Sequence, residues 1–368
     1  MSDSLSEPKS TTPREPLPPV QPPSASFLLQ LFLIPLVIVT VIVMVWLLFS
    51  WLAHMGSNPQ DLVRDIGKVN DASWQRAYNL AELLRKPQYQ HLKQDRALAK
   101  ELAATLTSLR DSRPQRKRSA ASETDEARKQ RSDAVYENRI KLEVYLCHVL
   151  GEFEVDDSLA ALIAAAGPDA SGDPEGFAVR SAALGAIAVQ AGQRSSDALH
   201  DNTTLMQTLI ESSKERGDGA YADEEYDKLR SAAAYTLGMV GGEEALERLA
   251  QMLDDADANV RYNAALGLCR HGDSRALTVL EEMLDPTSTA GLDDPDAQGN
   301  QEILASGQQW KRVQVLTNAI RGARMLATAR PQADYRELSE WLAKIEAADV
   351  IEKVKLDAKD LRLELEKS

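Results

Sequence analysis

Residues 230–254 read RSAAAYTLGMVGGEEALERLAQMLD, and residues 261–285 read RYNAALGLCRHGDSRALTVLEEMLD. The two stretches align at an offset of 31 residues without a gap. A sequence that repeats with a period of about 20 to 50 residues is typical of a solenoid, in which each unit packs only on its neighbours. The repeat therefore predicts the fold class, and it favours a binding surface over a catalytic pocket.

The first half of each copy has the periodicity of a helix with one small-residue stripe. Small and apolar residues recur three, four, seven, eight and eleven positions after an arginine, which is the spacing of one helix face. Small residues in such a stripe allow a neighbouring helix to approach closely. The stripe comprises Ala183, Leu184, Ile187, Ala188 and Ala191 after Arg180; Ala233, Ala234, Leu237, Gly238 and Gly241 after Arg230; and Ala264, Ala265, Leu268, Cys269 and Gly272 after Arg261.

The second half of each copy predicts a leucine-rich helix after a short turn that contains glycine. Its leucines occupy matching positions in the two copies, namely Leu246, Leu249 and Leu253, and Leu277, Leu280 and Leu284. Asp257 is the expected N-cap of the helix that begins the second copy, and Pro286 is the expected stop signal at its end. The repeating unit is therefore helix, tight turn, helix.

These units resemble HEAT repeats of the short bacterial type, which also occur in phycobilin lyases. The resemblance covers roughly residues 175–285 and implies an all-α, HEAT-like α-solenoid. Outer units are weaker: RIKLEVYLCHVLGEF begins at Arg139 and its stripe is interrupted by Glu143, whereas RVQVLTNAIRGARML begins at Arg312. The stretch SWQRAYNLAELLRKP, which contains Trp74, predicts a divergent first unit.

The composition along the chain predicts six segments. They are a disordered Pro-rich tail (1–26), a single transmembrane helix (27–52), a divergent membrane-proximal helical repeat region (57–110), a charged disordered insertion (111–133), the HEAT-like repeat solenoid (134–346) and a C-terminal capping helix (347–368). A polar capping helix is expected because the last repeat of a solenoid has no neighbour to cover it. Several insertions follow leucine-type helices, so they are expected to project from one edge of the solenoid. They either form a recognition surface or occur there because turns at this edge tolerate extra length.

Residues 27–52 read FLLQLFLIPLVIVTVIVMVWLLFSWL, and no charged residue lies between Glu15 and Asp61. A helix of this length reaches about 39 Å, enough to cross a hydrocarbon core of about 30 Å. Trp46 and Trp51 fit an interfacial aromatic belt. A cleaved signal peptide is the alternative, but the apolar stretch is longer than a signal core and follows a Pro-rich tail, which favours an uncleaved anchor. The basic residues on the two flanks are nearly balanced, with a slight excess that favours a cytoplasmic solenoid.

No motif in the sequence indicates catalysis, a cofactor or a metal site. The string Asp255 to Asn259 imitates the start of a calcium loop, but Val260 and Leu266 stand where that loop needs Gly and Glu, so we interpret it as a helix-capping turn. The loop with Asp293, Asp294 and Asp296 is a weak cation candidate. Cys147 and Cys269 occupy the same position of the stripe, and we expect both to be buried packing residues.

The net charge of −14 argues against nucleic acid as a partner. A basic cluster inside the charged insertion is compatible with anionic lipid or an acidic partner, although a solvated loop is favoured. The cluster consists of Arg113, Arg116, Lys117 and Arg118.

We therefore predict a membrane-tethered scaffold for protein–protein interaction, bound to the bilayer through residues 27–52. It is expected to need no cofactor and to have no small-molecule substrate. The alternative is a lyase-like factor that attaches a chromophore or otherwise modifies a protein, as the resemblance to phycobilin lyases implies. That alternative is weaker because repeat similarity transfers a fold and not an activity.

Overall fold

A computed structural model shows the chain as two compact units, Met1–Asn58 and Pro59–Ser368. It describes residues 25–54, 59–68, 70, 72–113, 126–168, 176–194, 197–216, 223–292 and 301–367. Within these ranges every regular element is a helix, as the sequence periodicity predicts. Residues 1–24, which hold most of the predicted Pro-rich tail, lie outside the described part.

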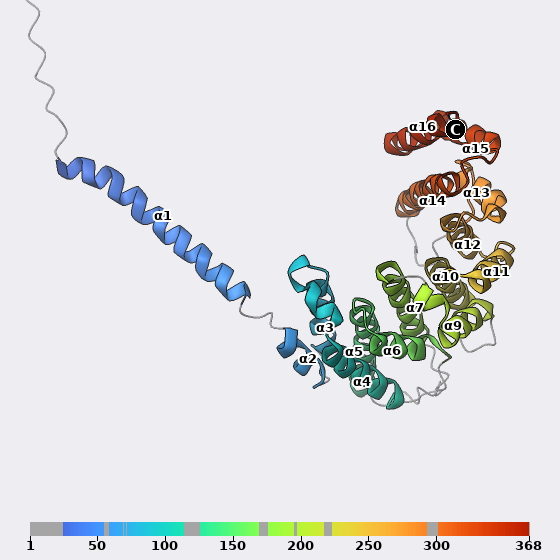
Figure 1. Cartoon of the computed structure of the whole chain (residues 1–368). Helices are drawn as coiled ribbons and strands as arrows, with labels where there is room; N and C mark the ends of the chain where they lie inside the picture. Colours follow the sequence, from blue (N-terminus) through green and yellow to red (C-terminus); the bar gives the residue numbers. More distant parts are fainter. Residues whose placement is uncertain are drawn as a thin grey trace, which may run out of the picture. The chain divides into compact units, whose positions relative to one another are not determined.

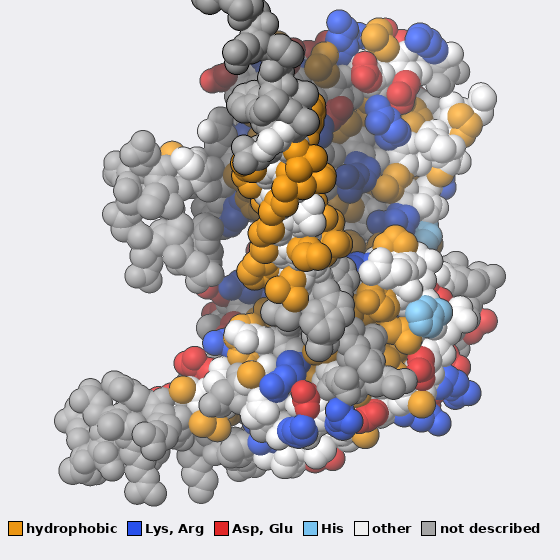
Figure 2. Space-filling view, turned by 90° about the vertical axis from the view of Figure 1, so that its left-hand side faces the viewer, with side chains coloured by type: hydrophobic (Ala, Val, Ile, Leu, Met, Phe, Trp, Pro, Cys, Tyr) orange, Lys and Arg blue, Asp and Glu red, His pale blue; other side chains and the backbone are white. Residues whose placement is uncertain are grey.

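The first unit contains the long apolar helix α1 (Ala25–His54). Its large apolar side chains from Leu29 to Phe49 are between 45% and 73% exposed, and they form a continuous hydrophobic column (Figure 2). The hydroxyl of Thr40 donates to the carbonyl of Leu36 at 2.8 Å, so this polar group is satisfied inside the helix. Residues Leu31–Ser50 are long and apolar enough to cross a membrane, although a signal sequence meets the same criteria. The side chain of Trp51 lies outside the described residues.

The second unit is an array of helices. In chain order they are α2 (Pro59–Ile66), α3 (Ser73–Leu84), η1 (Pro87–Gln94), α4 (Arg96–Asp111), α5 (Glu126–Gly151), α6 (Asp156–Ala166), α7 (Gly176–Gln193), α8 (Asp197–His200), α9 (Thr203–Lys214), α10 (Asp223–Val240), α11 (Glu243–Met252), α12 (Ala258–Arg270), η2 (Ser274–Ala276), α13 (Leu277–Leu284), α14 (Gln301–Ala329), α15 (Arg336–Ala347) and α16 (Glu352–Leu365).

These helices form two layers, which is the arrangement expected of a solenoid. The inner layer consists of α3, α5, α7, α10, α12 and α14, and it follows the concave side of this unit (Figure 1). The outer layer consists of α4, α6, α9, α11, α13 and α15. Helix α16 packs against α14 and α15 at the end of the stack. At the other end, Trp74 of α3 stacks on Tyr145 of α5 with ring centroids 5.7 Å apart, so α3 is part of the inner layer.

The small-residue stripe lies at the contacts between inner helices, as the sequence predicts. A Cβ atom added to Gly238 would lie 2.6 Å from the Cα atom of Gly267, a separation that real side chains do not reach. Helices α10 and α12 therefore approach closely only because both positions are glycine. Leu237 and Leu268 are completely buried, which confirms the proposed register.

The turns use the residues that the sequence analysis singled out. Gly241 and Gly272 have φ values of 73° and 70°, a backbone conformation that favours glycine, and each lies just after an inner helix. The carboxylate of Asp257 accepts from the backbone N–H of Val260 at 3.0 Å, so it is the N-cap of α12. The apparent calcium loop is thus a helix-capping turn.

The outer helices are rotated relative to the predicted leucine stripe. Leu249, Leu280 and Leu284 are buried as expected, whereas Leu246, Leu253 and Leu277 are only half-buried. The buried positions between them are taken by Ala245, Met252, Val279 and Met283. The difference arises because an outer helix has the stack on one side only, so residues at the edge of its apolar face remain partly accessible.

The repeat arginine has a structural role that the sequence did not reveal. Its guanidinium donates to a backbone carbonyl at or just beyond the C-terminal end of the preceding outer helix. The bonds are Arg139 to Leu109, Arg180 to Ala166 (3.1 Å), Arg230 to Glu215 (3.3 Å) and Arg261 to Asp255 (2.8 Å). The last carbonyls of a helix lack intrahelical partners and carry partial negative charge, so a cation at this place stabilises the helix end.

The segment between helices α4 and α5 is shorter than the charged insertion that the sequence predicts for residues 111–133. Helix α4 continues to Asp111, and α5 begins at Glu126. Arg113 is buried and forms an ion pair with Glu143, the residue that interrupts the stripe of α5. Burial raises the pKa of the Glu143 carboxyl, against the opposing effect of Arg113 and Arg139. Residues 114–125, with the rest of the basic cluster, lie outside the described residues.

Candidate binding groove

A groove of 1210 Å³ crosses the inner layer over α10, α12 and α14. Its position follows from the solenoid, because consecutive inner helices present equivalent faces to the same side. Many of the residues that line it lie two before, two after or five after the repeat arginine of an inner helix. They include Lys228, Ala232 and Tyr235 on α10; Asn259, Asn263 and Leu266 on α12; and Trp310 and Gln314 on α14.

Two aromatic side chains stand exposed in this groove. Tyr235 is 47% exposed on α10, and Trp310 is 61% exposed on the N-terminal part of α14. Large exposed aromatic side chains on a folded surface are typical of binding sites, because they offer much contact area and lose little conformational freedom. Both residues therefore make the groove a candidate recognition surface.

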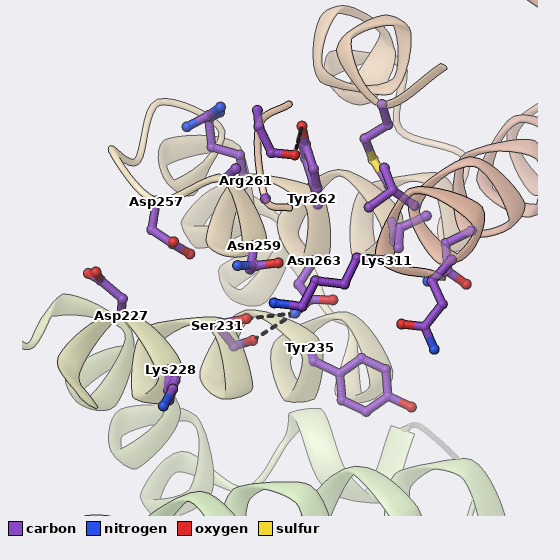
Figure 3. A pocket seen from close by; sticks show the side chains of 18 of the residues that line it. Asp227, Lys228, Ser231, Tyr235, Asp257, Asn259, Arg261, Tyr262, Asn263 and Lys311 are labelled. Carbon is purple, nitrogen blue, oxygen red and sulfur yellow. Dashed lines mark hydrogen bonds between the residues drawn. The ribbon is translucent and has the colours of Figure 1, made fainter. Parts of the chain in front are cut away.

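Amide side chains form the middle of the groove. The Nδ2 group of Asn263 donates to the hydroxyl of Ser231 at 2.8 Å and to its carbonyl at 3.3 Å, which links α12 to α10 (Figure 3). In the same view Lys311 extends from α14 over Asn263. An amide can donate and accept at once, so Asn259, Gln314 and Asn318 supply both kinds of hydrogen-bonding group to this surface.

Glu224 lines the groove and is exposed, whereas the other nearby carboxylates are engaged within the fold. Asp227 pairs with Arg230 at 2.6 Å, and Asp257 caps α12. Glu282 accepts from Arg261 at 2.6 Å and from the hydroxyl of Tyr262 at 3.1 Å. Burial and the nearby Glu282 raise the pKa of Tyr262 to about 12, so this hydroxyl remains a neutral donor.

The described residues contain no group of three His, Cys, Asp or Glu side chains that could hold a metal ion. Asp293, Asp294 and Asp296 lie outside those residues. Cys147 and Cys269 are completely buried, as predicted, and burial raises the pKa of each thiol to about 12. Neither thiol has the properties of a nucleophile.

The sequence analysis located possible recognition on the edge where insertions project and did not predict this groove. A signal was present, because Tyr235 and Leu266 each lie five residues after a repeat arginine, and Asn263 and Gln314 each lie two residues after one. These positions lie outside the apolar stripe that repeats in the two copies, so their common face became evident only when the helices were stacked.

Comparison with known proteins agrees with this architecture. Residues 220–290 match the family model for HEAT repeats. No curated protein matches the chain. The matched segment includes α10 to α13, and thus two of the three helices that form the groove. HEAT repeats commonly serve as scaffolds for protein–protein interaction and are generally not catalytic.

Proposed function

We propose that this protein is a membrane-tethered scaffold that binds an extended segment of a partner protein in the groove over α10, α12 and α14. The groove itself carries the proposal. Its exposed Tyr235 and Trp310 suit apolar side chains of a ligand, while its amide groups can pair with the N–H and C=O groups of an extended backbone. The scaffold has no catalytic activity of its own.

Crosslinking from inside the groove tests this function. A photoreactive amino acid at Tyr235 or Trp310 should crosslink to one partner in the native cell, and the crosslinked residues should fall in one short stretch of that partner. A synthetic peptide of that stretch should then bind the purified protein. Thr278 is exposed on α13 of the outer layer and provides the matched control position. Equal crosslinking from Thr278, or a peptide that does not bind, would contradict the proposal.

The membrane tether is a separate part of the proposal and is supported by the exposed apolar surface of α1. An uncleaved anchor predicts that the protein isolated from cells retains residues 27–52 and resists extraction at alkaline pH. A cleaved signal predicts a shortened chain in the soluble fraction. Mass spectrometry of the mature protein distinguishes the two. We propose a cytoplasmic solenoid from the flanking basic residues, and labelling of an introduced exposed cysteine from either side of the membrane tests the orientation.

We do not propose chromophore attachment, because that alternative rests on repeat similarity alone. It predicts that a bilin mixed with the protein acquires a new absorption band, which provides a simple check.

A further inference from the structure

A second cavity of 140 Å³ continues the groove toward the C-terminal ends of α10 and α12. It shares Tyr235, Asn263 and Asn318 with the larger groove, so a ligand lying in one can reach the other. Arg270 of α12 and Arg321 of α14 also line it, and both are exposed. We call this cavity the arginine pocket.

The two arginines differ from most others in the solenoid because no partner among the described residues neutralises them. Arg230 pairs with Asp255 at 2.9 Å, Arg275 with Glu247 at 2.8 Å and Arg362 with Glu346 at 2.6 Å. Within the described part of the chain, the side chains of Arg270 and Arg321 form no hydrogen bond or ion pair. This contrast is notable in a protein with a net charge of −14, where carboxylates are abundant.

A purely structural role does not explain the pair. Arg270 is the last residue of α12, where a cation interacts favourably with the helix dipole. Arg321 does not interact with a helix end in this way, because α14 continues to Ala329. Two like charges in one pocket repel each other, and no carboxylate among the described residues pairs with either of them to offset that cost.

We propose that the arginine pocket binds the carboxylate of an acidic side chain in the partner's extended segment. This inference rests on the proposed function and names the chemistry of the ligand. Guanidinium groups bind carboxylates through short, paired hydrogen bonds, and the amides of Asn263 and Asn318 supply further donors.

Charge complementarity identifies the partner as acidic. Lys228 is exposed on the groove face of α10, two helical turns before Tyr235, and has no ion-pair partner among the described residues. It supplies a second cationic position for the same ligand. Because the protein as a whole is negative, it repels acidic chains except where such uncompensated cations lie, and this gives the site selectivity.

Fluorescence anisotropy with a labelled peptide of alternating Glu and Ser residues tests the inference on the full-length protein in detergent. The peptide should bind, and added salt should weaken the binding. Arg270→Gln and Arg321→Gln should each weaken binding about tenfold, and Arg321→Lys should restore only part of it because the paired geometry is lost. Both arginines are exposed and unpaired, so unchanged circular dichroism should show that the variants are folded.

The matched controls separate a carboxylate site from general attraction. Arg336→Gln, on outer-layer helix α15, should leave binding unchanged, and a peptide with Gln in place of Glu should bind much more weakly. All peptides carry an amidated C-terminus, so binding reports side-chain carboxylates. The inference is overturned if the double variant Arg270→Gln/Arg321→Gln binds like the original protein, if the Gln peptide binds equally well, if binding requires a free C-terminus, or if inorganic phosphate at matched ionic strength displaces the peptide.

Failure of this inference would not by itself remove the proposed function. If Tyr235 and Trp310 still crosslink to a partner stretch whose peptide binds equally well to the double variant, the groove is a binding site without a carboxylate requirement. If crosslinking from the groove also fails, the scaffold proposal fails with it.

Discussion

The repeats of α10 to α13 and the unit of α4 to α6 differ in where their charged residues lie relative to the apolar stripe. In both regions an arginine of the inner helix reaches the end of the preceding outer helix. The stripe of α10 and α12 is built wholly from small and apolar residues, and its ion pairs lie outside the stripe. The stripe of α5 instead contains Glu143, which is buried with Arg113. Apolar periodicity therefore identifies a repeat easily only where the charged contacts remain outside the stripe.

The largest effect is expected from breaking the buried pair. Arg113→Met leaves Glu143 in the core without its main partner, and the free energy of unfolding should fall by about 3 to 5 kcal/mol. The double variant Arg113→Met/Glu143→Leu should recover most of that loss, because a buried ion pair stabilises little more than apolar residues of similar size. Urea unfolding followed by circular dichroism measures both. A double variant as unstable as the single one would show that the pair is required for the fold of α5.

A slightly smaller effect is expected in the apolar stripe of α12. Leu268→Ala removes a completely buried side chain and should cost about 2 to 5 kcal/mol in the same measurement. Leu356 is 52% exposed on α16, so Leu356→Ala should change stability by less than about 0.5 kcal/mol. Equal effects of the two substitutions would mean that the register of the repeats is wrong.

The N-cap of α12 should contribute less to the free energy of unfolding than the buried Leu268. Asp257→Ala removes the acceptor for the Val260 N–H and should cost about 0.5 to 2 kcal/mol. Asp257→Asn is the matched control, because asparagine caps a helix about as well as aspartate. If the string from Asp255 to Asn259 bound calcium instead, calcium would raise the thermal midpoint of the original protein and not that of the alanine variant.

The smallest effect should appear in the pH dependence of stability. The contributions of Asp255 and Glu143 to the free energy of unfolding should change with pH in opposite directions. Burial acts to raise the pKa of Asp255, but hydrogen bonds from Arg230 and from the backbone of Asp257 outweigh it and the pKa is lowered. Its stabilising effect is therefore present above the unfolded carboxyl pKa of about 3.9 and is lost as pH falls through the folded value. Asp255→Asn should make the loss of stability in acid less steep.

Glu143 should behave in the reverse direction. Because its folded pKa is raised, its contribution is greatest below the unfolded value of about 4.3 and declines as pH rises through the folded value. Glu143→Gln should remove that decline. Denaturation midpoints measured across the acidic range check both slopes, and the same sign for Asp255 and Glu143 would contradict the assigned pKa shifts.

The sequence by itself determined the helical solenoid, the register of the inner helices and the capping turns. These features depend on contacts between residues that are close in the chain or in adjacent repeats. The residues that make these contacts therefore recur in the sequence with the period of 31 residues. Gly238 illustrates this, since it lies in the stripe that the offsets predict and packs closely on Gly267 of the next inner helix. Leu237, Leu268 and both cysteines are buried for the same reason.

Only the tertiary structure decided where charged and exposed groups lie. Arg113 and Glu143 are 30 residues apart in sequence, and nothing in either segment identifies the other as its partner. The groove likewise combines residues from three helices whose individual faces look like ordinary solvated surface. Its aromatic, amide and cationic groups act together only because stacking turns one face of each inner helix to the same side, and that alignment is a property of packing.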